Sequence, residues 1–210
     1  MTTDTVVCPP RKGLLICVSG PSGVGKGTMI RKIREIDPCV AHSISVTTRN
    51  PRRDEIEGVS YYFRSKEAFE QMLASGEILE HDSYCGNDYG TPRTPLARMV
   101  EQGIDVVMDI TVPGSLSVME NYPGVITVFL MPPSYSELRR RLMKRGTEDE
   151  TVMELRMKKA RDEIRQCSLF QYVVVNDDLD TAARRILGII EAERCRYKNM
   201  KGIEDQVLAL

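Results

Sequence analysis

Short apolar runs alternate along the chain with longer segments in which apolar residues recur every three or four positions. Four of the runs predict buried strands, because each is too short for a helix and is bounded by polar residues; they lie at 14–18, 104–108, 125–130 and 172–175. Helical spacing predicts helices at 26–36, 94–102, 135–144 and 180–198, with Ser134 as the N-cap of the third. This alternation indicates an α/β fold, a parallel sheet flanked by helices.

The stretch 43–92 interrupts the alternation. It is rich in Thr, Arg, Pro, Gly and Tyr, in short pieces of β character with one short helix expected near 67–74. We interpret it as an inserted subdomain of mainly antiparallel strands. A second interruption at 145–151, a glycine followed by acidic residues between two basic helices, is typical of a mobile loop. The core would then comprise about 13–42 and 93–198, with tails at 1–12 and 199–210.

Charge and composition narrow the classes of partner. The 210 residues include 29 basic and 30 acidic side chains, a formal net charge of −1, which gives no electrostatic footprint for nucleic acid or an anionic membrane. No run approaches the roughly 20 apolar residues that a membrane span needs. The polar stretch 1–12 has no apolar segment of the kind found in secretory signals, so we expect a cytoplasmic protein.

Cysteine and histidine do not indicate a metal site. The six cysteines are scattered singly, and neither His42 nor His81 stands at the spacing of zinc ligands. We therefore expect free thiols and no metal held chiefly by protein ligands.

The strongest local signal follows the first predicted strand. Gly20-Pro21-Ser22-Gly23-Val24-Gly25-Lys26-Gly27-Thr28 leads directly into a predicted helix. Glycines let successive backbone N–H groups converge on a phosphate, and the helix N-terminus adds its positive dipole. Lys26 supplies a mobile positive charge for the outer phosphates, so this segment is interpreted as a P-loop that binds ATP.

One position departs from the usual P-loop. Gly27 stands where Ser or Thr commonly holds magnesium, and the resulting Gly-Lys-Gly-Thr is also familiar from adenylate kinases. We expect Mg²⁺ to be held mainly through nucleotide phosphates and water. Asp109, at the end of an apolar run, stands where such folds place an acidic group near the metal.

The insertion contains a candidate second phosphate site. Arg49 and Arg52 are three residues apart with Pro51 between them, and guanidinium groups chelate phosphate oxygens in a fixed geometry. Glu80 and the segment 86–91 follow.

Together these motifs resemble guanylate kinase, a family of P-loop enzymes that phosphorylate GMP with ATP. The matching pieces are Gly-Pro-Ser-Gly-Val-Gly-Lys at 20–26, Thr-Thr-Arg-x-Pro-Arg at 47–52, Gly-Asn-x-Tyr-Gly-Thr at 86–91 and Val-Asn-Asp-Asp at 175–178. They occur in the family's order over about 13–198. The resemblance implies a P-loop NTPase-type core, a GMP-binding insertion at about 43–92 and a mobile lid at about 144–156.

The resemblance also implies residue roles. The GMP phosphate would be held by Ser45, Arg49, Arg52, Tyr61 and Tyr89, and the guanine would be read by Glu80 and by the Thr91 hydroxyl, which can donate to O6. Catalysis would rest on Lys26, Arg49 and Asp109 together with Arg141, Arg145 and Arg156, which close on the transferring phosphate, while Asn176 borders the adenine.

The chain also departs from the family pattern. Many members have a second Asp where this chain has Thr111, and a Gln-Gly turn where it has Pro113-Gly114; Asp88 replaces a common tyrosine. Two other functions keep the same outline: a ribose bisphosphate kinase, which needs no guanine reader, and a catalytically silent scaffold domain, which typically has an eroded P-loop. Glu80 with Thr91 disfavours the first, and Lys26 with the arginines disfavours the second.

Overall fold

The four apolar runs of the sequence form strands of one sheet in the computed structural model, which describes residues 11–84, 86–143 and 150–208. A fifth strand, at one edge, is the three-residue Val40–His42, which the sequence pattern did not predict. Every neighbouring pair is parallel, as expected. From edge to edge the strands are Val40–His42 (β2), Asp105–Asp109 (β7), Leu15–Ser19 (β1), Ile126–Met131 (β8) and Tyr172–Val175 (β9).

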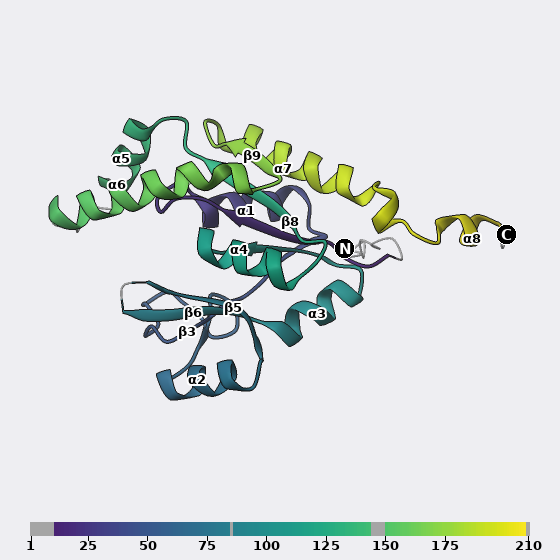
Figure 1. Cartoon of the computed structure of the whole chain (residues 1–210), viewed down its shortest axis with the longest axis horizontal. Helices are drawn as coiled ribbons and strands as arrows, with labels where there is room; N and C mark the ends of the chain where they lie inside the picture. The colour runs from purple at the N-terminus through teal and green to yellow at the C-terminus, as the bar shows by residue number, and fades with distance from the viewer. Residues whose placement is uncertain (1–10, 85, 144–149, 209–210) are drawn as a thin grey trace, which may run out of the picture.

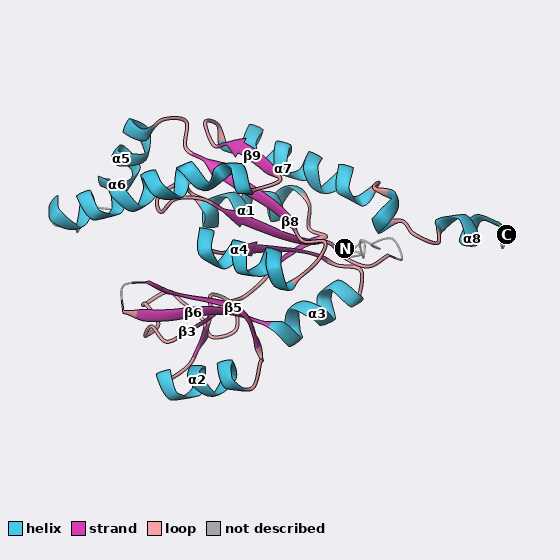
Figure 2. Ribbon diagram, viewed as in Figure 1, coloured by secondary structure: helices cyan, strands magenta, loops and turns pink. Residues whose placement is uncertain are grey.

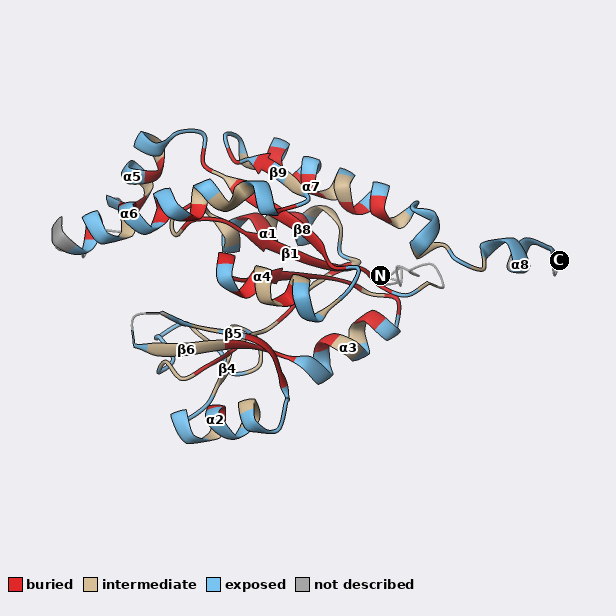
Figure 3. Ribbon diagram, in the orientation of Figure 1, coloured by how far each residue is buried: buried red, intermediate tan, exposed pale blue. Residues whose placement is uncertain are grey.

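Helices cover both faces of this sheet, because alternate residues of its central strand are apolar on either side (Figure 1). Ile16 and Val18 pack with the apolar sides of α1 and α7, whereas Leu15 and Cys17 pack with α3 and α4. The strands are correspondingly the most buried part of the molecule (Figure 3). These helices are Lys26–Ile36 (α1), Arg93–Glu101 (α3), Val112–Asn121 (α4) and Leu179–Arg194 (α7).

The insertion folds as a second, smaller sheet beside the first (Figure 2). Two of its three strand pairings are antiparallel and one is parallel, in agreement with the expected mainly antiparallel arrangement. One short helix covers its far side, with Phe69 buried against Val46 and Ile78. The elements are Val46–Thr47 (β3), Tyr62–Phe63 (β4), Lys66–Ala74 (α2), Ile78–Tyr84 (β5) and Asn87–Pro92 (β6).

Helix α4 is absent from the expectations, which assigned no element between the strands at 104–108 and 125–130. Thr111 is its N-cap, since the hydroxyl oxygen accepts from the Gly114 N–H at 3.2 Å. Pro113 stands in the first turn, where a missing backbone N–H costs nothing. The cap and the proline therefore start a helix at a place where composition suggests a turn.

The C-terminal part contains the remaining helices. Ser134 caps the helix that follows β8, with its oxygen accepting from the Glu137 N–H at 3.0 Å, as predicted. The last long helix ends at Arg194, four residues earlier than expected, and short helices follow it. The elements are Tyr135–Met143 (α5), Glu150–Arg165 (α6), Gln166–Leu169 (η1), Tyr197–Asn199 (η2) and Ile203–Leu208 (α8). None of the helices in 11–84, 86–143 and 150–208 is long and apolar enough to cross a membrane.

A buried ion-pair cluster joins three distant segments at the start of β7. The Asp105 carboxylate accepts from Arg11 at 2.6 and 2.8 Å, from Arg194 Nε at 2.8 Å and from the Leu14 N–H at 2.7 Å. Burial alone would raise the pKa of Asp105, but these donors hold it below its ordinary value. The cluster anchors the segment before β1 and the end of α7 to the same strand.

Candidate active site

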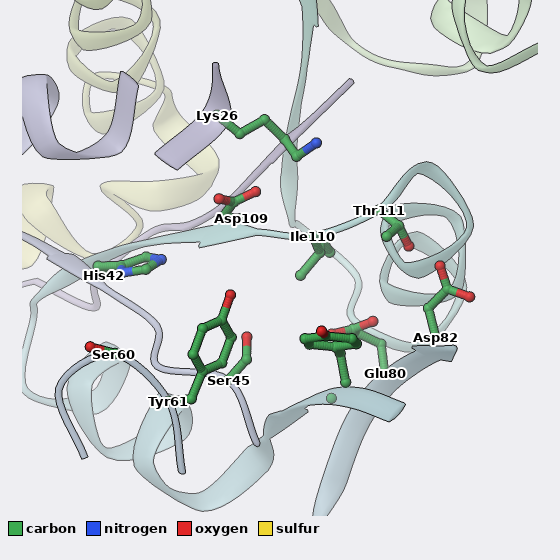
Figure 4. A pocket seen from close by; sticks show the side chains of 12 residues that line it. Lys26, His42, Ser45, Ser60, Tyr61, Glu80, Asp82, Asp109, Ile110 and Thr111 are labelled. Carbon is green, nitrogen blue, oxygen red and sulfur yellow. The ribbon is translucent and has the colours of Figure 1, made fainter. Parts of the chain in front are cut away.

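A cavity of about 290 Å³ lies between the two sheets, beyond the carboxyl ends of β1 and β7 (Figure 4). Parallel α/β sheets bind ligands at this end, because the loops that follow the strands converge there. Its upper wall comes from the core and its lower wall from the insertion. The lining residues are Lys26, His42, Ser45, Ser60, Tyr61, Glu80, Asp82, Tyr89, Gly90, Asp109, Ile110 and Thr111.

The P-loop has the tight backbone that phosphate binding requires. Gly23 has φ of +86°, and a Cβ there would lie 2.6 Å from the Leu142 side chain, so both its conformation and its surroundings demand glycine. Lys26 begins α1, and its Nζ donates to the Gly20 carbonyl at 2.8 Å. The lysine thus lies folded along the loop at the helix N-terminus, within reach of the cavity that it lines.

Asp109 lies against the unusual Gly27 of the P-loop. A Cβ at Gly27 would be 3.7 Å from Asp109 Oδ2, so the carboxylate occupies the side of the loop where Ser or Thr is common. Burial raises the pKa of Asp109, while the charges of Lys26 and His42 act in the opposite direction. Burial likewise lowers the pKa of His42. Lys26, His42 and Asp109 thus form a group of titratable side chains lining the cavity.

Arg141 and Asn176 both contact the P-loop backbone. Asn176 Nδ2 and Arg141 Nη1 donate to the Val24 carbonyl at 2.8 and 3.2 Å, and Arg141 Nη2 donates to the Asn176 carbonyl at 3.1 Å. Arg141 Nε donates to Glu137 at 2.8 Å. The hydrogen bonds from Arg140 and Arg141 lower the pKa of Glu137 to about 2. In this structure the Arg141 guanidinium therefore links the P-loop, at Val24, to the segment that follows β9, at Asn176.

The lower wall presents an arginine among aromatic rings. Arg49 donates to both oxygens of Glu55 at 2.8 and 2.9 Å, and its guanidinium lies 5.4 Å from the centroid of the Tyr61 ring. Tyr61 in turn meets Tyr89 edge to face, with ring centroids 6.1 Å apart. The ion pair with Arg49 holds the pKa of Glu55 below its ordinary value. Arg49 is thus aligned by Glu55 beside Tyr61, a lining residue of the cavity.

Glu80 is a buried carboxylate at the other end of the lower wall. The Thr91 hydroxyl donates to Glu80 Oε1 at 2.6 Å, and both side chains are buried. Burial raises the pKa of Glu80, the Thr91 hydrogen bond lowers it, and the charge of Asp82 raises it further. In this arrangement the Thr91 proton is already donated, so Thr91 orients Glu80; the expected donation to guanine O6 would require the hydroxyl to turn.

The structure brings six of the expected residues around one cavity. Lys26, Asp109, Ser45, Tyr61, Glu80 and Tyr89 line it, and Thr91 lies directly behind Glu80. The Arg52 side chain is exposed, and its backbone N–H donates to Glu55 at 2.9 Å. Arg156 is half-buried in α6. Of the lid expected at 144–156, residues 150–156 belong to α6, and Arg145 lies outside the described residues.

Several residues of the site were missed from the sequence, among them His42, Asp82 and Thr111 as lining residues of the cavity, and Gly114, which lies against Glu80. Asp82 could have been found, because it is two positions from Glu80, and such residues face the same side of a regular strand. Gly114 could not, since only the fold shows that a Cβ there would lie 2.4 Å from Glu80 Oε2.

Comparison with known proteins agrees with this geometry. The sequence profile of the guanylate kinase family matches residues 12–193. A guanylate kinase of Halalkalibacterium halodurans is 45% identical over 189 residues, covering 90% of this chain and 93% of the relative, and that of Bacillus subtilis is 44% identical, covering 92% and 98%. The crystal structure of guanylate kinase from Anaplasma phagocytophilum superposes with a TM-score of 0.78 at 35% identity, covering 94% of each chain. With the P-loop, the insertion and their shared cavity in place, the chain belongs to the guanylate kinase family.

Proposed function

We propose that this chain transfers the γ-phosphoryl group of ATP to GMP, giving ADP and GDP, through the cavity between its two sheets. The observation that supports this most directly is that one cavity joins the P-loop lysine, Lys26, to a buried carboxylate, Glu80, held by Thr91. A residue that would bind the phosphates of ATP and a residue that would recognise the base of GMP therefore line one cavity. This is the reaction of the guanylate kinase family.

The donor side lies on the P-loop. Phosphoryl transfer needs in-line positioning and positive charge on the equatorial oxygens more than covalent chemistry. Lys26, which donates to the Gly20 carbonyl in this structure, would move to the β- and γ-phosphates. Asn176, whose Nδ2 donates to the Val24 carbonyl, would border the adenine. Arg145 and Arg156 are proposed to close on the transferring group, as the family resemblance implies.

The acceptor side lies on the insertion. Ser45, Tyr61 and Tyr89 line the part of the cavity that would take the GMP phosphate. Arg49 lies against the Tyr61 ring, and Glu55 keeps its guanidinium oriented for the phosphate. Arg52, exposed in this structure, is proposed to join them on the GMP phosphate, as the family resemblance implies. Since water must be excluded so that ATP is not hydrolysed, the insertion would move toward the core, with hinges near Ser43 and Pro92.

The site suits a magnesium ion that arrives with ATP. Its oxygen donor near the phosphates is Asp109, beside Gly27 and Lys26, and a hard cation prefers oxygen ligands. The described residues contain no cluster of three or more His, Cys, Asp or Glu side chains that could hold a metal alone. Asp109 would therefore orient the ion, and the ion would supply charge to the phosphate oxygens. The cytoplasmic location expected from the sequence stays a prediction.

The assignment of the base is tested by Glu80→Gln. A carboxylate accepts from both N1–H and the 2-amino group of guanine, whereas IMP lacks the 2-amino group. Sites built on such hydrogen bonds discriminate by about 10⁴-fold or more, so wild type should strongly prefer GMP to AMP and IMP. Glu80→Gln should lower GMP turnover far more than IMP turnover. Glu77→Gln, an exposed position just before β5, is the matched control.

Two outcomes would contradict the proposal. An unchanged GMP-to-IMP ratio in Glu80→Gln would remove Glu80 as the guanine reader. Turnover of ribose 1,5-bisphosphate in place of GMP by the wild type would favour a ribose bisphosphate kinase instead.

A further inference from the structure

Asp82 has a carboxylate oxygen without a hydrogen-bond partner. Its Oδ1 accepts from the Ser83 N–H at 2.8 Å, but its Oδ2 is buried and has none among the residues that the structure describes. A buried acceptor left unpaired is costly, and such groups in native proteins generally have a partner in some functional state. Asp82 lines the same cavity as Glu80 and Lys26 (Figure 4). The missing partner is therefore to be sought in the ligand of that cavity.

Strand geometry places Asp82 beside the guanine reader. Glu80 and Asp82 are two positions apart on β5 and both line the cavity, and Asp82 is paired across the sheet with Tyr89 of the same cavity. The charge of Asp82 raises the pKa of Glu80 and that of Glu163 on α6. Asp82 therefore adds negative potential at this end of the cavity, which favours a ligand group that only donates hydrogen bonds.

Across the cavity stands Thr111, toward which the Asp82 carboxylate points (Figure 4). Many guanylate kinases have an acidic residue at that position. In this chain the Thr111 oxygen accepts from the Gly114 N–H and carries no charge. Apart from Glu80, the remaining acids that line the cavity are Asp82 and Asp109, and Asp109 lies at the P-loop. The second acid at the base end thus comes from β5.

Guanine has a donor that Glu80 leaves unpaired. Its Watson–Crick edge offers N1–H and a 2-amino group with two hydrogens, and one carboxylate accepts N1–H and only the nearer amino hydrogen. The second amino hydrogen needs another acceptor beside Glu80. We propose that Asp82 Oδ2 accepts it, so that Asp82 is a second specificity-determining residue for guanine. This inference rests on the proposed function.

The test is Asp82→Ala, assayed with GMP, IMP and deoxy-GMP. Because the substitution removes a hydrogen bond to a charged group, kcat/KM for GMP should fall by about 10- to 100-fold. IMP lacks the 2-amino group, so kcat/KM for IMP should stay nearly unchanged. The gap between GMP and deoxy-GMP should stay as in wild type. Asp88→Ala is the matched control, since its carboxylate lies on neighbouring β6, is bonded to Ser83 Oγ and is not among the residues lining the cavity.

A second variant asks whether the acid itself matters. Asp82→Ala/Thr111→Asp returns a carboxylate to the opposite side of the same space, and Asp keeps the capping role at the start of α4. It should recover most of the GMP-to-IMP ratio lost in Asp82→Ala. If Asp82→Ala does not fold, as judged by its circular dichroism, Asp82→Leu replaces it in the same comparison, because leucine has a similar branched shape and no acceptor atom.

The outcomes are distinct. Equal losses for GMP and IMP would overturn the inference, and so would a narrowed gap between GMP and deoxy-GMP, which would place Asp82 on the ribose. A wild type that does not use GMP would instead refute the proposed function, before any variant is compared.

Discussion

Gly114 stands where helix α4 meets the Glu80 carboxylate, and Gly114→Ala should disturb guanine recognition without touching the P-loop. A Cβ here would lie 2.4 Å from Glu80 Oε2, whereas real Cβ contacts under 3.0 Å essentially do not occur. The carboxylate must therefore retreat, and the Thr91 hydroxyl holds its other oxygen at 2.6 Å. Recognition geometry tolerates about 0.5 Å, and an error of about 1 Å costs about 10²-fold. We expect kcat/KM for GMP to fall by about 10- to 100-fold.

The variant should remain folded. Gly114 is helical, so alanine recovers roughly 0.5–1 kcal/mol of helix propensity against an overpacking cost of typically about 1–3 kcal/mol. The assay compares kcat/KM for GMP and IMP, the calorimetric Kd for ATP, and Tm. Gly188→Ala is the control, because Gly188 lies in α7 with nothing within 4 Å of an added Cβ, and it should raise stability while leaving the kinetics unchanged.

Two results would refute this reasoning. Wild-type kcat/KM for GMP in Gly114→Ala would mean that Glu80 does not read the base from its present position. A weakened Kd for ATP comparable with the loss on GMP would mean that the substitution acts through the whole fold.

Three further predictions concern the donor site, pH and stability. Lys26→Ala should lower kcat by about 10²- to 10³-fold, because the lysine binds the phosphates that are being transferred. The Kd for GMP, measured by calorimetry, should stay nearly unchanged. Near-normal turnover would argue against the P-loop assignment. Burial raises the pKa of Glu80, so its carboxylate becomes protonated at a higher pH than an ordinary Glu. The ratio of kcat/KM for GMP to kcat/KM for IMP should therefore fall as the pH is lowered. A ratio that does not change with pH would contradict this. Asp105→Ala should reduce the urea-derived free energy of unfolding by about 3–5 kcal/mol, because it leaves Arg11 and Arg194 without their buried partner. Since the folded-state pKa of Asp105 is depressed, this wild-type stability is present above the unfolded-state pKa and is lost as pH falls toward the folded-state value. If Asp105→Ala lowers the free energy of unfolding by less than about 1 kcal/mol, the cluster contributes little to stability.

Local sequence signals predicted the core strands and the helix that follows the first of them well. The strand Tyr172–Val175 has the expected bounds, and Leu15–Ser19 differs by one residue, because short apolar runs bounded by polar residues leave few alternatives. Helix α4 was missed because Pro113 and Gly114 are typical of turns, and only the capping by Thr111 shows that they begin a helix.

Long-range contacts limited what could be predicted of the site. Arg141 was expected at the transferring phosphate, yet in this structure its guanidinium bonds Val24, 117 residues away, and Asn176. No local pattern contains that contact. The same holds for Gly114, whose role depends on a strand of the insertion more than thirty residues earlier, namely β5 at Ile78–Tyr84.

The parallel pairing of β1 bears on how the chain folds as it is synthesised. Leu15 of β1 pairs with Val106 of β7, 91 residues later in the chain, and β8 comes later still. A nascent chain therefore leaves the ribosome with its first strand unpaired until the whole insertion has emerged. The smaller sheet needs only β3 to β6, all within Val46–Pro92, so it can form first. Once formed, it brings the flanking segments together and shortens the loop that β1 and β7 must close, which lowers the entropic cost of assembling the ATP-binding sheet.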